Sequence, residues 1–85
     1  MSQTVITIAS IAELRRAIDN MRRLITKTHI EADRFARKAA ETTDTVWRDE
    51  YNREAAELRD FSFRVLVPKL QALETTWRER AESLS

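Results

Sequence analysis

The chain has 85 residues, no Cys, no Gly and one Pro, and its 15 basic and 14 acidic side chains give a net charge of +1. These values limit it to one domain and exclude disulfides, thiolate metal sites and Gly-rich phosphate-binding loops. The near-neutral charge argues against a dedicated nucleic-acid binder, and no apolar run reaches the roughly 20 residues that span a bilayer. We therefore expect an all-α, cytoplasmic protein; without a signal peptide, its export would need a dedicated system.

Residues 1–9 precede the first predicted helix, which covers residues 10–43. The β-branched residues 4–8 have no second strand with which to pair, so we expect residues 1–9 to be extended or disordered. Ser10, followed three residues later by Glu13, fits a capping box at the helix start. Apolar or small side chains then recur every three or four residues, which predicts a heptad seam packed along a second helix. The seam comprises Ile11, Leu14, Ile18, Met21, Ile25, Thr28, Ala32, Phe35, Ala39, Thr42 and Val46.

A cluster of short polar residues around Trp47 predicts the connection between two helices, an elbow at residues 44–48. Asp49 can accept hydrogen bonds from the free amides at the start of a second helix, and its charge suits the positive end of the helix dipole. We interpret Trp47 either as closing the open end of the helix pair or as binding a partner. The two roles are compatible.

The second predicted helix covers residues 49–84 and is kinked near Pro68. Proline lacks the amide that would bond to the carbonyl of Arg64, so we expect a kink or short break around residues 64–67. The seam of this helix comprises Tyr51, Ala55, Leu58, Ser62, Leu66, Leu70, Leu73, Trp77, Ala81 and Leu84.

Residues 61–67 are apolar around most of the helix circumference. One neighbouring helix cannot cover such a segment, so the sequence predicts a homo-oligomer or a heterodimer with a related helical hairpin. The residues predicted to bind the partner are Trp47, Tyr51, Phe61, Phe63, Leu66, Val67, Leu70, Ile25 and Phe35.

Charge is unevenly distributed along the chain. Residues 1–30 hold five basic and two acidic side chains, residues 31–60 hold six and nine, and residues 61–85 hold four and three. The elbow end of a hairpin is therefore acidic and the end with the two termini is basic. Two hairpins packed head to tail set these opposite charges together, which predicts an antiparallel four-helix bundle.

Nothing in the sequence indicates catalysis, a metal site or a cofactor. His29 is the only His, which predicts a flank residue beside the seam, because one His forms neither a metal pair nor a catalytic dyad. Glu50, Glu54 and Glu57 share a helical face near Arg53, as in a solvated, salt-bridged surface. Trp77 lies on the seam and is expected in the core. An alternative anion-binding surface is the basic stripe of Arg15, Arg16, Arg22 and Arg23.

Trp47-Arg48-Asp49 resembles the elbow of the WXG-type proteins, the small ESX-like helical hairpins of type VII secretion, with Asp49 in place of Gly. Tyr51 and Phe61 stand where the aromatic residues that follow the motif would be, and the spacing from Ile8 through Ser10 to Leu14 resembles the family's entry into its first helix. The resemblance implies a hairpin that dimerises into an antiparallel four-helix bundle. The family's Tyr-x-x-x-Asp/Glu export signal does not follow the second helix.

These observations lead to two functional hypotheses. The first is a non-enzymatic, WXG-like, secretion-associated interaction module, which is either a secreted factor or an adaptor or chaperone for a toxin or effector. The alternative is a small regulatory or antitoxin-like protein that binds nucleic acid or a toxin through the basic stripe.

Overall fold

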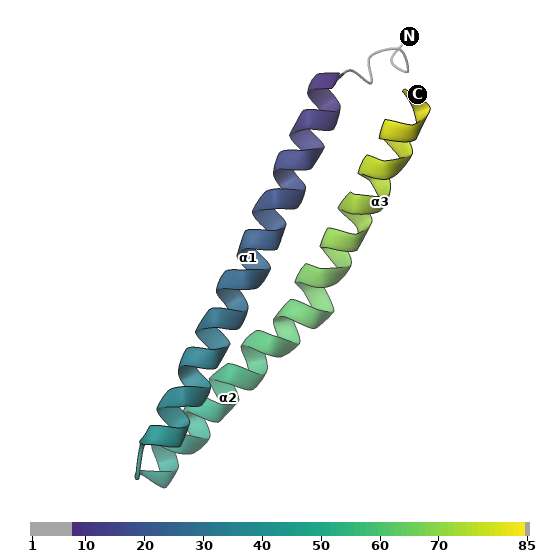
Figure 1. The fold of residues 1–85 in the computed structure, drawn as a ribbon. Helices are drawn as coiled ribbons and strands as arrows, with labels where there is room; N and C mark the ends of the chain where they lie inside the picture. The colour runs from purple at the N-terminus through teal and green to yellow at the C-terminus, as the bar shows by residue number, and fades with distance from the viewer. Residues whose placement is uncertain (1–7, 85) are drawn as a thin grey trace.

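The computed structural model describes residues 8–84 and is an all-α hairpin with two antiparallel arms (Figure 1). The first arm is α1 (Ile8–Glu41). The second arm comprises α2 (Thr45–Phe61), the π-helical turn η2 (Ser62–Leu66) and α3 (Val67–Ser83). No described residue lies in a strand. The molecule measures 63 × 17 × 16 Å, and its radius of gyration is 18.7 Å, against about 12 Å for a compact domain of this length.

The first helix begins and ends earlier than predicted. It is already helical at Ile8, so Ser10 lies inside its first turn and the predicted capping box does not mark its start. The prediction for residues 1–7 lies outside the described residues. At the other end, α1 stops at Glu41, and the hydroxyl of Thr42 accepts a hydrogen bond from the amide of Asp44. Such local bonds of Thr compete with helix hydrogen bonds, which explains why α1 ends before residue 43.

The connection comprises residues 42–44, and Asp44 rather than Asp49 caps the second helix. The backbone of Asp44 is extended, and its carboxylate accepts hydrogen bonds from the amides of Val46 and Trp47 at 2.9 and 3.3 Å. Asp49 therefore lies inside α2, and the prediction that it starts the helix is wrong. No described residue has a positive φ angle, so this turn does not require Gly.

The predicted seams form the contact between the two arms. Every seam residue predicted on α1 from residue 11 to 39 is buried or half-buried, as is Thr42 in the connection. Val46 is an exception, because it lies in the first turn of α2 and is 70 % exposed. Leu84, at the end of the second seam, is also exposed. The buried set is small and half of it is alanine: Ile18, Ala32, Ala39, Ala55, Ser62 and Leu66.

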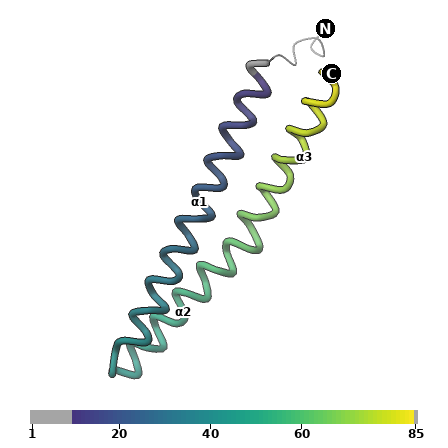
Figure 2. Tube along the Cα trace, viewed as in Figure 1, coloured from purple at the N-terminus to yellow at the C-terminus, as the bar shows by residue number. Residues whose placement is uncertain are grey.

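The second arm stays helical through residues 64–67, so the expected break is absent, as the continuous trace of Figure 2 shows. In η2 the amide of Val67 donates to the carbonyl of Ser62, five residues earlier. Seam residues Leu58, Ser62, Leu66 and Leu70 follow one another at steps of four, which would drift off the contact face of a regular α-helix. The wider π-turn absorbs the extra residue, and it lies directly before the Pro ring that would crowd a regular turn.

Candidate protein-binding surface

The seam divides the surface of the hairpin into two flanks of different character. Leu24 and Phe61 each precede a seam residue, Val65 follows Phe61 by four residues, and Trp47 precedes Phe61 by two heptads. In an antiparallel helix pair these positions share one side of the contact. We call them the apolar flank. Their exposed fractions are 44 % for Leu24, 56 % for Trp47, 47 % for Phe61 and 38 % for Val65.

The opposite flank is polar apart from the exposed Phe63, and it carries ion pairs that cross between the arms. Arg22 bonds to Glu74 at 2.7 Å, and Arg59 bonds to Asp33 at 3.1 Å. These side chains are substantially exposed, so each pair is worth only about 0–1 kcal/mol. Their contribution to stability is small. They make this flank charged, whereas the other flank is apolar.

His29 joins the polar flank to the π-turn. Its Nε2 lies 2.9 Å from the hydroxyl of Ser62, which is fully buried, and its ring meets the edge of Phe63 with centroids 5.5 Å apart. The sequence predicted His29 beside the seam but did not indicate Ser62 as its partner. No local pattern identified it, because a Ser in a helix can also bond to a carbonyl of its own helix, as Thr28 and Thr75 do here.

The elbow end carries an aromatic group that does not close the hairpin. Trp47 lies against Tyr51 with ring centroids 5.8 Å apart, and Tyr51 in turn lies 6.2 Å from Phe35. Lys38 places its ammonium over the rings of Phe35 and Tyr51, at 5.5 and 5.9 Å. Trp47 stays more than half exposed, whereas Phe35 and Tyr51 are half-buried. The interpretation of Trp47 as a plug is therefore not supported.

The other predicted partner-binding residues divide by exposure. Phe63 is 63 % exposed, whereas Leu66 is only 4 % exposed and belongs to the core of the hairpin itself. Leu66 offers no surface to a partner. The half-buried remainder, which can contribute part of a shared core, comprises Ile25, Phe35, Tyr51, Val67 and Leu70.

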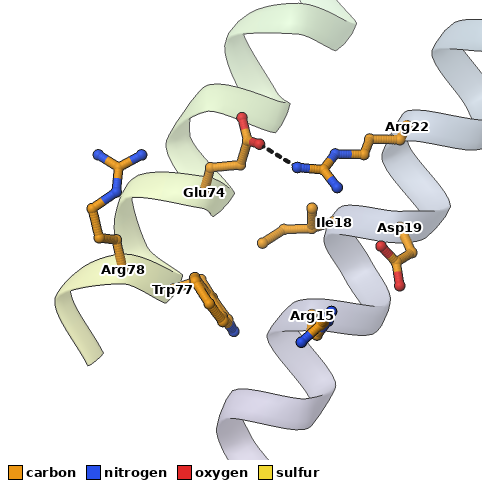
Figure 3. A pocket seen from close by; sticks show the side chains of 7 residues that line it. All are labelled: Arg15, Ile18, Asp19, Arg22, Glu74, Trp77 and Arg78. Atoms are coloured by element: carbon orange, nitrogen blue, oxygen red, sulfur yellow. Dashed lines mark hydrogen bonds and ion pairs between the residues drawn. The ribbon is translucent and has the colours of Figure 1, made fainter. Parts of the chain in front are cut away.

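A cleft of about 310 Å³ lies between α1 and α3 (Figure 3). It is lined by Arg15, Ile18, Asp19, Arg22, Glu74, Trp77 and Arg78. The indole N–H of Trp77 is buried there without a hydrogen-bond partner. The predicted basic stripe is thus divided: Arg15 and Arg22 line the cleft, whereas Arg16 and Arg23 are exposed and do not.

The acidic face of α2 behaves largely as predicted. Glu50 forms an ion pair with Arg53 at 2.9 Å.

Among the described residues there is no group of three or more His, Cys, Asp or Glu side chains placed to hold a metal ion. Within the same part of the chain, every helix is too short or too polar to cross a membrane. Comparisons of the chain with protein-family models, with curated proteins and with solved structures found no match.

Proposed function

We propose that this chain is a protein–protein interaction module whose apolar flank binds a second helical hairpin, either another copy or a related chain. The observation that carries the proposal is the exposure of Leu24, Phe61 and Val65 along one side of a core made largely of alanine. Large apolar side chains grouped on one surface are typical of protein interfaces.

The exposed area supports the need for a partner. The chain exposes 6579 Å², whereas a compact monomer of 10.0 kDa exposes about 5,200 Å². The excess is larger than the roughly 800 Å² that one partner buries in an interface of standard size. A second hairpin on the apolar flank would remove much of this excess.

Symmetry and charge support a head-to-tail arrangement of the two hairpins. Leu24 lies at the middle of α1, and the hydrogen bond between His29 and Ser62 places the π-turn near the same level. A two-fold axis at this level brings the apolar flanks of two copies together. It also sets the acidic elbow of each copy, from residues 31–60 with a net charge of −3, beside the end of the other copy that holds residues 1–30, with a net charge of +3.

The test of this proposal is the mass of the chain in solution. Light scattering after size exclusion should give at least twice the chain mass of 10.0 kDa. Phe61→Asp should raise the dissociation constant by about 100-fold or more, because the charge is introduced at both symmetry-related positions. Ile30→Asp is the matched control, since Ile30 is 53 % exposed but lies away from both seams. A parent chain that stays monomeric at millimolar concentration would refute pairing with a second copy and leave a related chain as the partner.

For the biological setting we propose a WXG-like, secretion-associated role, as a secreted factor or as an adaptor for a toxin or effector. The support is the helical hairpin with Trp47 next to its connection. Export of the chain should then depend on a type VII apparatus if it is a secreted factor. If it is an adaptor, it should co-purify from the cell interior with an effector.

A second candidate, binding of nucleic acid, is favoured only by Arg16 and Arg23. They lie seven residues apart, are exposed, and have no ion-pair partner among the described residues. Fluorescence anisotropy with a labelled duplex would detect such binding through its steep dependence on salt.

A further inference from the structure

The cleft between α1 and α3 combines several features that together point to a ligand. It lies beside the polar flank, because Arg15, Arg22 and Glu74 each follow a seam residue. It is therefore separate from the apolar flank that the proposed partner would cover. Its floor is apolar, formed by Ile18 and the indole of Trp77, and its walls carry charged side chains from both arms (Figure 3).

The first feature is an unsatisfied donor. The indole N–H of Trp77 is buried and has no hydrogen-bond acceptor. In Figure 3 the nitrogen-bearing edge of this ring lies toward Arg15 on α1. A buried donor without an acceptor destabilises the fold, and an acceptor that reached it would remove that destabilisation. Because the nitrogen is covered, the acceptor must displace a neighbouring side chain to reach it.

The second feature is a guanidinium without a counter-ion. Arg22 crosses the cleft to Glu74, but one heptad further toward the termini Ala81 takes the position that corresponds to Glu74. Asp19 lies one turn from Arg15 on α1 and lines the same cleft, but the two form no ion pair. Arg15 is exposed and has no hydrogen bond or ion pair within the described part of the chain. Its side chain is therefore free to move and to pair with an incoming anion.

The third feature is the sum of charges around the cleft. Arg15, Arg22 and Arg78 oppose Asp19 and Glu74, which leaves one net positive charge. A ligand with a single negative charge balances this sum. A phosphate dianion would bring one negative charge more than the sum requires, and it would be repelled by Asp19. A planar carboxylate also matches the paired N–H donors of the Arg15 guanidinium, and it can accept a hydrogen bond from the indole N–H of Trp77.

We propose that this cleft binds a carboxylate carried on a short apolar stem. The carboxylate pairs with Arg15 and accepts a hydrogen bond from the indole of Trp77, while the stem lies on Ile18. The same chemistry is offered by a Glu side chain of a second copy, whose elbow half is acidic, and by a free small carboxylate. The site does not depend on the proposed pairing through the apolar flank.

The test follows the indole N–H signals of the full-length chain in two-dimensional ¹H–¹⁵N correlation NMR spectra. The chain has two Trp residues, so Trp47→Phe assigns the signal of Trp77. Adding sodium butyrate should shift the Trp77 signal in a saturable manner and leave that of Trp47 unchanged. Arg15→Gln should weaken this binding by about tenfold, because a charge-assisted hydrogen bond is lost. Arg16→Gln removes the same charge from an adjacent residue outside the cleft and should leave binding unchanged.

Two further titrations separate the sources of the carboxylate. If it comes from a second copy, the Trp77 signal should shift with protein concentration before butyrate is added, and Arg15→Gln should abolish that shift. If it is a free small molecule, the signal should respond to butyrate only. A stronger response to inorganic phosphate than to butyrate would overturn the assignment to a carboxylate. An unchanged Trp77 signal with every addition would overturn the site itself, whatever the oligomeric state proves to be.

Discussion

The hydrogen bond between His29 and Ser62 should stabilise the hairpin more than any other single polar contact between the two arms. Its oxygen is fully buried and the two atoms are 2.9 Å apart. His29→Ala removes a bond worth about 1 kcal/mol and leaves the Ser62 hydroxyl without its partner, which costs about 1–3 kcal/mol. We expect a total loss of at least about 2 kcal/mol in the free energy of unfolding. Ser62→Ala should cost less than half of this, because His29 is partly exposed and can bond to water instead.

Urea denaturation followed by far-UV circular dichroism, at one fixed protein concentration, measures these changes. A loss of 2 kcal/mol corresponds to a fall in Tm of about 8–16 °C for a domain of this size. The double variant His29→Ala/Ser62→Ala should be more stable than His29→Ala by about 1 kcal/mol, because it has no buried hydroxyl without a hydrogen-bond partner. Arg59→Ala is the control: it breaks the exposed pair with Asp33 and should cost under about 1 kcal/mol. Additive effects of the two single changes would refute the reasoning.

Two further predictions concern the elbow and the π-turn. Asp44→Ala should lower the free energy of unfolding by about 1 kcal/mol through loss of the cap, whereas Asp49→Ala should change it by less than about 0.5 kcal/mol; equal urea midpoints for the two variants would contradict the assignment of the cap. In a Pro68→Ala background, where no ring crowds the turn, deletion of Arg64 should restore regular spacing along the seam and keep the free energy of unfolding within about 1 kcal/mol of its parent. Insertion of one alanine at the same place should instead cost more than about 2 kcal/mol, because it turns the seam of α3 away from α1.

The fold followed from the sequence because its determinants are repeated. Two heptad seams without Gly predict two packed helices, and errors at single positions do not change that result. The boundaries were less certain, because Asp44 and Asp49 have the same capping chemistry. What separates them is the end of α1 at Glu41, which depends on the competing hydrogen bonds of the Thr residues that follow.

The surface was harder to predict than the fold. The apolar segment around Phe61 was recognised, but its division into an apolar flank and a polar flank depends on which residues face across the hairpin. Arg22 and Glu74 are 52 residues apart in sequence, and His29 and Ser62 are 33 apart. Such pairs leave no local pattern. The π-turn was also missed, because Pro68 suggested a break, whereas the run of seam residues at steps of four indicated an added residue in a continuous helix.

The alanine residues of the core have a geometric consequence for assembly. Ala32, Ala39 and Ala55 let the helices approach closely in the elbow half, whereas Ile18 and Trp77 stand between them near the termini. The arms accordingly pack more closely in the elbow half than toward the terminal end, which makes the hairpin a tapered rod. Two tapered rods fill a cylinder of even width only when the narrow end of each lies beside the wide end of the other. The sizes of these core side chains thus favour one direction of pairing before any charge is considered.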